Sequence, residues 1–178
     1  MNKPYSQTGM TLAELLITLA VAAILIVGST TALPRFIQEG RMVTEVNHFT
    51  TALALARSTA IMQDHRVVLC PSRDRSSCGN SQDWSSGWLL FASDDRNRDP
   101  AEPVLQAGEL MGTGIALHVG NQRRHIVYQP DGSSGGTNAS FTFCDRRHHA
   151  RPRVICLSNS GRSRLSRRTC GGQPVRCP

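Results

Sequence analysis

The chain has 178 residues and a formal net charge of +7 at pH 7. Setting aside an N-terminal leader and an apolar segment up to residue 33 leaves roughly 145 residues, enough for one soluble domain with a modest core but not for several domains. The charge is uneven, because residues 144–178 hold nine arginines and one acid, a local charge of +8 that leaves −1 for all earlier residues.

The first feature in chain order is an apolar segment from Leu15 to Leu33, nineteen residues without a charge. As a helix it extends for roughly 28 Å, close to the thickness of a bilayer's hydrocarbon core, so it can span a membrane. A secretory signal peptide is the alternative, but its apolar region is shorter and its start more basic than a lone Lys3. Glu14 decides against it, because a carboxylate there costs at least ~2.5 kcal/mol to bury and needs a partner.

A short polar leader ends in Gly9, and it is followed by the apolar residue Met10 and, four residues later, by Glu14. This combination resembles type IV prepilins and pseudopilins, although phenylalanine is commonest where Met10 stands. The resemblance implies that a prepilin peptidase cuts after Gly9 on the cytoplasmic side and methylates the new N-terminal amine. It also implies that Glu14 neutralises the N-terminal amine of a neighbouring pilin. A simple single-pass anchor is the alternative interpretation.

A second helical segment follows the apolar one. Pro34 can bend the helix, and Arg35 marks its exit into water on the side opposite the leader. Apolar residues then recur at steps of three and four, which predicts one apolar face packed on a sheet. These residues are Val43, Val46, Phe49, Leu53, Ala56 and Ala60.

The expected organisation has four parts, namely a leader at 1–9, a membrane or filament-core segment at 10–34, an amphipathic half-helix at 35–63 and a β-rich domain at 64–178. By the same resemblance, the chain sits in the inner membrane with its C-terminal domain in the periplasm, and enters a pilus with other pilins.

After residue 63 the pattern changes to short apolar runs separated by turn residues, which predicts an antiparallel sheet. With a long helix before the strands, the predicted fold class is α+β. The runs lie at 67–70, 87–92, 103–106, 114–119, 125–129, 140–144 and 153–158. Glycines and serines at 130–136 predict an exposed, mobile loop.

The six cysteines all follow the apolar segment, and an even number in an exported domain indicates three disulfides and an oxidising compartment such as the periplasm. Fifteen pairings are possible, and we expect sequential neighbours because each pair brackets a turn. The expected pairs are Cys70–Cys78, Cys144–Cys156 and Cys170–Cys177.

A zinc site built from two cysteines and two histidines is the alternative, but it lacks a C-x-x-C knuckle, and exported thiols oxidise. Its members would be Cys144, His148, His149 and Cys156. Residues 94–99 begin like a calcium loop, yet arginines lie between the acids, so we expect no metal there. The chain has no glycine-rich phosphate loop, no G-x-S-x-G and no H-E-x-x-H, and we expect neither enzyme activity nor a cofactor.

The middle of the chain combines V-L-C at 68–70, a loop to Cys78 and D-W-S-S-G-W-L-L-F at 83–91. This stretch resembles the domain shared by minor pilins and minor pseudopilins of the GspH/FimT family. Trp84, Trp88 and Phe91 are interpreted as core and turn anchors rather than as a ligand-stacking site.

The C-terminal region contains Gly161-Arg162-Ser163-Arg164, and Arg167 and Arg168 follow it. Within this family it resembles the G-R-x-R motif that FimT proteins of naturally transformable bacteria use to bind DNA. The resemblance implies that Gly161, Arg162 and Arg164 form a DNA-binding motif for uptake during natural transformation. If the segment is extended, the two arginines of the motif point the same way about 6.6 Å apart, so their guanidinium groups can grip neighbouring phosphates.

Further arginines enlarge the basic region. Arg146 and Arg147 lie between Cys144 and Cys156, and a hairpin clamped by those cysteines would bring them beside the motif. No Phe, Tyr or Trp follows Cys144, which favours contact with the DNA backbone over base stacking or sequence reading.

Two other functions stay open. One is a structural minor pilin that primes pilus assembly without binding DNA, and the other is a minor pseudopilin of a type II secretion system. In both, the basic region is a solvated face or a contact for an acidic neighbour.

Overall fold

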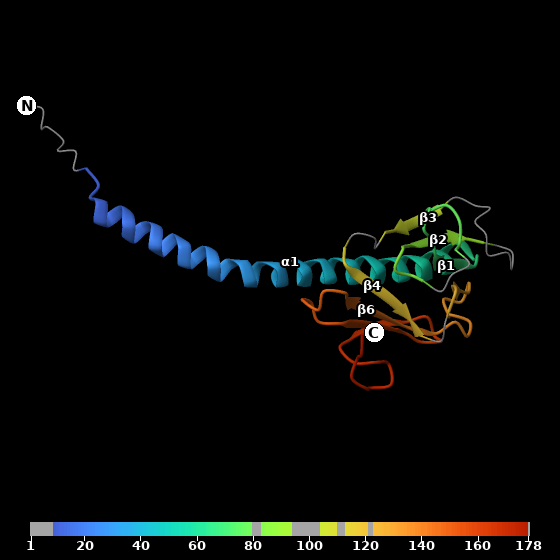
Figure 1. The fold of residues 1–178 in the computed structure, drawn as a ribbon. Helices are drawn as coiled ribbons and strands as arrows, with labels where there is room; N and C mark the ends of the chain where they lie inside the picture. The colour runs from blue at the N-terminus through green and yellow to red at the C-terminus, as the bar shows by residue number, and fades with distance from the viewer. Residues whose placement is uncertain (1–8, 80–82, 94–103, 110–112, 121–122, 178) are drawn as a thin grey trace, which may run out of the picture. The chain divides into compact units, whose positions relative to one another are not determined.

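The structure is a computed structural model that describes residues 9–79, 83–93, 104–109, 113–120 and 123–177, without the side chains of 27–32 (Figure 1). The leader residues 1–8 and the calcium-like loop 94–99 lie outside the described residues. Helix α1 spans Leu12–Gln63. The strands are β1 (Val67–Pro71), β2 (Trp88–Ala92), β3 (Val104–Gly108), β4 (Ile115–Val119), β5 (Ile126–Tyr128), β6 (Ala139–Asp145), β7 (Arg153–Leu157) and β8 (Ser163–Ser166).

The strands form two four-stranded sheets, with orders β3-β2-β1-β5 and β4-β6-β7-β8. Every pairing is antiparallel, which confirms the predicted α+β class. The division into two sheets could not be predicted, because periodicity identifies strands but not which strands share a ladder. The last strand, β8, was absent from the predicted apolar runs, since only one of its four residues, Leu165, is apolar.

The chain has two compact parts, residues 1–37 and 38–178, and helix α1 contributes residues to each. In the first part Thr11 caps the helix, because the Glu14 N–H donates to Thr11 Oγ1 at 3.3 Å. Thr11 and Glu14 thus have the T-x-x-E spacing of a capping box. No helix in the described part of the chain meets the length and apolarity that a membrane span requires.

In the second part, α1 buries one face. Val46, Phe49 and Leu53 are each 1% exposed, as the helical periodicity predicts. Val43 is 36% exposed instead, and Met42, one residue earlier, is fully buried in its place. The periodicity therefore located the buried face correctly and missed its edge by one position.

This face packs against side chains from both sheets in one core. Phe49 lies at its centre, with its ring 4.8 Å from Phe141 and 5.7 Å from Phe143 of β6, and 5.7 Å from Trp88 of β2. Trp84 and Trp88 are buried, which agrees with their interpretation as core anchors. The helix therefore holds two separate sheets together through one aromatic cluster.

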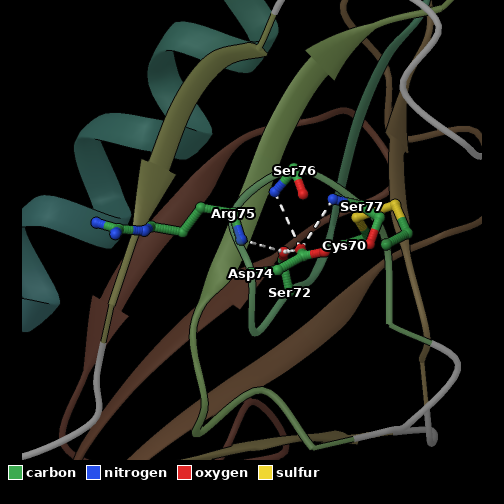
Figure 2. Close-up of a disulfide and its surroundings, with 7 residues drawn as sticks. Cys70, Ser72, Asp74, Arg75, Ser76 and Ser77 are labelled. Atoms are coloured by element: carbon green, nitrogen blue, oxygen red, sulfur yellow. Dashed lines mark hydrogen bonds between the residues drawn. A yellow bond between two sulfur atoms is a disulfide. The ribbon is translucent and has the colours of Figure 1, made fainter.

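A second cluster, with Cys70, Leu89 and Phe91, covers the other face of the first sheet. The loop after β1 folds over it and is tied down by the Cys70–Cys78 disulfide, the one predicted pair that the structure contains (Figure 2). Within this loop, Asp74 Oδ1 accepts the N–H groups of Ser76 at 3.0 Å and Ser77 at 2.9 Å. The Ser77 hydroxyl donates to Asp74 Oδ2 at 2.7 Å.

The hydrogen bonds to Asp74, first that of the Ser77 hydroxyl and then those of the two backbone N–H groups, hold the pKa of its carboxyl well below its usual range. A lowered pKa adds stability that is complete above the unfolded-state value of about 3.9 and is lost as the pH falls below it. We therefore expect Asp74→Asn to lower the melting temperature fully at pH 7 and by a progressively smaller amount as the pH falls below about 4, with part of the difference remaining at pH 2 because the folded-state pKa is lower still. The check is a series of near-UV circular dichroism melts from pH 7 to pH 2. A constant difference between the two proteins at every pH would contradict this assignment.

Candidate nucleic-acid interface

The G-R-S-R motif lies on a tight hairpin between β7 and β8. Leu157 pairs with Ser163, and the loop between them closes when the Ser158 N–H donates to the Arg162 carbonyl at 3.0 Å. Gly161 has a φ of +73°, in the left-handed region that such short hairpin loops require of one residue. The hairpin places Arg162 at the start of an edge strand.

Gly161 is also the point where the hairpin touches another loop. A Cβ at this position would lie 1.9 Å from the Gly132 carbonyl oxygen and 3.2 Å from Cε1 of Tyr128. No side chain fits there. Since Gly161 is buried, its part in the motif is to shape the turn rather than to meet a ligand.

The loop at 130–136 was predicted to be exposed and mobile, but Gly132 and Ser134 are buried. The Ser134 hydroxyl donates to the Ser158 carbonyl at 2.9 Å, and its N–H to the Asn159 carbonyl at 2.9 Å. On the other side, Arg57 of α1 donates to the Gly132 carbonyl at 3.1 Å. The glycines here permit close backbone contact rather than motion, and the loop forms a wedge between α1 and the hairpin.

The two disulfides of the C-terminal region are Cys144–Cys177 and Cys156–Cys170. The predicted pairs Cys144–Cys156 and Cys170–Cys177 were wrong. In the ladder of β6 and β7, Phe143 pairs with Arg153, so Cys144 and Cys156 are offset by four residues, about 13 Å along the strands. A disulfide needs Cα atoms within about 7 Å, so these two cannot bond. Because both are in disulfides, the alternative zinc site is excluded as well.

These two disulfides lay the tail, residues 167–177, across the outer face of the second sheet. Cys156 alternates with the core residue Ile155, so it faces away from α1, and Cys170 is attached to it. The tail turns back on itself where the Thr169 N–H donates to the Gln173 carbonyl at 2.9 Å. Figure 1 shows this C-terminal segment, in red, on the side of β6 away from α1.

The one acid of the C-terminal region, Asp145, is 3% exposed. Its carboxylate accepts the N–H groups of Arg147 at 3.1 Å, His149 at 2.7 Å and Ala150 at 2.9 Å, and the Gln38 amide at 3.1 Å. Burial raises the pKa of Asp145, but these donors together lower it below its usual value. The buried carboxylate thus holds the backbone of the β6–β7 turn in place and links it to Gln38 of α1.

A second acid, Glu39 of α1, forms an ion pair with Arg153. Its carboxylate accepts from the Arg153 guanidinium at 2.5 Å and from the Arg151 N–H at 3.0 Å. The Arg153 hydrogen bond is the main cause of the lowered pKa of Glu39. Nothing in the sequence pattern marks this pair, because its members are 114 residues apart.

The predicted site arginines are all exposed, and the structure divides them between two ends of the second sheet. They are Arg146, Arg147, Arg162, Arg164, Arg167 and Arg168. Arg162 lies at the end where β7 finishes. Arg146 and Arg147 follow β6 at the opposite end, before β7 begins, and Arg167 follows β8 at that same end, because Ser166 pairs with Val154. We expected Arg146 and Arg147 to lie beside the motif. They do not, because the Cys144–Cys156 disulfide that would bring them there does not exist.

The arginines of β8 and the tail differ in their partners. Arg164 pairs with Cys156 across the ladder and shares its outward face. The Arg168 guanidinium donates to the Gly172 carbonyl at 3.3 Å and supports the tail turn. Arg162, Arg164 and Arg167 form no ion pair with any residue that the structure describes. These three are the guanidinium groups best placed to meet an anion.

Residues 45–161, more than half of the chain, match the family model described as Type II transport protein GspH. The chain belongs to the GspH family. Residues 5–30 match the prokaryotic N-terminal methylation motif, so this member of the GspH family is of the minor type IV pilin and pseudopilin class. No curated protein matches the chain.

Two crystal structures of the Pseudomonas aeruginosa type IV minor pilin FimU have the same fold. One is 20% identical, with a TM-score of 0.57, over 74% of this chain and 92% of FimU. The other is 19% identical, with a TM-score of 0.53, over 67% and 88%. The GspH-family match ends at Gly161, so Arg162 and every later arginine lie beyond it.

The contact between Gly161 and Gly132 predicts a large effect of a single methyl group. Gly161→Ala adds the left-handed strain of roughly 1–2 kcal/mol and a clash with backbone. Gly136→Ala is the matched control, because Gly136 has a φ of +79° but nothing within 4 Å of an added Cβ. We expect Gly161→Ala to lower the melting temperature by several degrees more than the control, at about 2–4 °C per kcal/mol. Equal losses would mean that the close contact is absent.

Proposed function

We propose that the chain is a minor type IV pilin, related in function to FimT, that binds DNA without sequence preference during uptake in natural transformation. The observation that carries this proposal is the set of exposed arginines on β8 and the start of the tail, of which Arg162, Arg164 and Arg167 lack an acidic partner among the described residues. The one acid of the C-terminal region, Asp145, accepts its hydrogen bonds from neutral N–H groups, and the nine arginines of residues 144–178 outnumber it.

The chemistry of this surface suits the phosphate backbone. Guanidinium groups bind phosphate oxygens through two parallel N–H donors and stay charged at every physiological pH. The absence of aromatic residues after Cys144 leaves no platform for stacking bases. Binding then depends on charge and releases counterions, which makes it sensitive to salt but not to sequence.

The residues of the motif have different parts in this proposal. Gly161 sets the turn, Arg162, Arg164 and Arg167 meet phosphates, and Arg168 stabilises the tail turn while adding charge. Arg146 and Arg147 contribute from the end of the sheet where β8 finishes, the same end as Arg167 and the one opposite Arg162.

For the N-terminal segment, we propose cleavage after Gly9, methylation of Met10 and pairing of Glu14 with the N-terminal amine of a neighbouring pilin. The matched methylation motif supports this processing. We further propose that residues 10–34 anchor the protein in the inner membrane before assembly. The three disulfides support a periplasmic location of the rest.

A second candidate function, that of a minor pseudopilin in type II secretion, is favoured by the family description. A third, a structural minor pilin without DNA binding, is favoured by the similarity to FimU. A deletion strain separates the three, because it would lose transformation, enzyme export or piliation, respectively.

The decisive test uses the mature chain in detergent with unrelated DNA duplexes, followed by fluorescence anisotropy at several salt concentrations. With four to six phosphates neutralised, log affinity should fall with log salt at a slope of roughly −4 to −5. Arg162→Gln/Arg164→Gln should weaken binding by roughly tenfold or more and reduce the slope by about 2. The matched control is Arg73→Gln/Arg75→Gln, which removes the same charge from the exposed loop after β1.

Loss of binding in both variants to the same extent would show a response to net charge alone and contradict a site on β8. No binding of the unchanged protein at low salt would remove the DNA function and favour the two structural alternatives.

A further inference from the structure

A cavity of about 350 Å³ lies between the β6–β7 turn and the end of the tail. Its lining includes His148, His149 and Arg151 from the turn and Cys177 from the tail. A volume of this size is in the range of sites for small ligands. None of the hydrogen bonds that shape the β8 hairpin involves these residues, so the cavity is separate from the G-R-S-R motif.

The side chains around the cavity are mainly donors and cations. His148, His149 and Arg151 are exposed, and Arg146 and Arg147 come from the same turn. Each imidazole offers at least one N–H, and each guanidinium offers several.

The acids nearby are already engaged. The Asp145 carboxylate, in the cavity wall, accepts four N–H donors from the protein, and Glu39 binds Arg153 and the Arg151 backbone. The turn and β7 hold four arginines, Arg146, Arg147, Arg151 and Arg153. Against them stand two carboxylates, those of Asp145 and Glu39, and both accept hydrogen bonds from protein donors. The remaining field at the cavity favours an anion.

We propose that this cavity is a second anion-binding site, which takes a phosphate group of the DNA held by the β8 arginines. This inference rests on the proposed function for the source of the phosphate. Because β8 runs back alongside β7, with Ser166 opposite Val154, Arg167 follows β8 at the cavity's end of the sheet, whereas Arg162 lies about 16 Å away along the strand, which equals roughly five phosphate steps of one DNA strand. A duplex longer than this contacts both sites at once, and the second contact gains from the effective concentration that the first provides.

The Cys144–Cys177 disulfide belongs to this site because it holds Cys177 in the cavity wall. Opening this bond frees the last residues of the tail and removes one side of the cavity. The site is therefore a property of the oxidised protein.

Histidine footprinting tests the proposal on the mature chain in detergent. Diethyl pyrocarbonate modifies accessible imidazoles, and mass spectrometry reports the rate at each histidine. We expect saturating 20-base-pair duplex, and separately inorganic pyrophosphate, to slow the modification of His148 and His149 several-fold. His65, exposed after α1, is the internal control and should react at an unchanged rate.

Two variants, each with a matched control variant, locate the effect. Arg151→Gln should abolish protection by pyrophosphate, while Arg73→Gln should leave it unchanged. Cys144→Ser/Cys177→Ser should abolish it as well, whereas Cys70→Ser/Cys78→Ser, which removes a disulfide from the other sheet, should not. Near-UV circular dichroism confirms that each variant is folded before its footprint is read.

The outcomes separate this inference from the proposed function. Unprotected histidines with both probes would overturn the cavity site, even where anisotropy shows that DNA binds. Protection by pyrophosphate without any DNA binding would support an anion site and overturn its assignment to DNA. Equal protection in Arg151→Gln would also overturn the site.

Discussion

The buried face of α1 is the constraint on which the rest of the domain depends. The two sheets share no strand, and what joins them is the apolar face centred on Phe49, whose ring contacts side chains of β2 and β6. Loss of the Phe49 side chain would open a cavity between the sheets, which remain linked by contacts such as those of Ser85 with Leu117 and of Trp84 with Phe141. The same helix also supplies the polar contacts that fix the C-terminal region, through Gln38, Glu39 and Arg57.

A series of close contacts links α1 to the hairpin that carries the arginines at the surface. Arg57 holds Gly132, Gly132 touches Gly161, and Gly161 sets the turn that begins the arginine strand. The first step uses the Arg57 guanidinium, but the contact between Gly132 and Gly161 involves no side chain, so main-chain geometry sets the turn that precedes Arg162. The strand that carries Arg162 and Arg164 is thus positioned by backbone contacts rather than by ion pairs of these arginines with described acids, which would neutralise them.

Sequence patterns predicted the α+β class, the buried helix face and most strands, because periods of 3.6 and 2 are local properties of the chain. They also located the basic region, since charge can be counted. They missed β8, which has too few apolar residues to show a strand pattern, and they paired two sets of cysteines wrongly. Strand register, a property of the folded sheet, decided the pairing by separating Cys144 from Cys156. The ion pair between Glu39 and Arg153 leaves no local signal either. A capping box at Thr11 and Glu14 was readable from the spacing alone.

The two tail disulfides are nested, since Cys156–Cys170 lies inside the loop closed by Cys144–Cys177. In a chain that reaches an oxidising compartment from its N-terminal side, Cys144 meets Cys156 before it meets Cys177. Oxidation in order of arrival therefore makes a bond that the folded sheet forbids. Maturation of this domain requires either that the second sheet forms before its thiols are oxidised or that an isomerase exchanges the first bond.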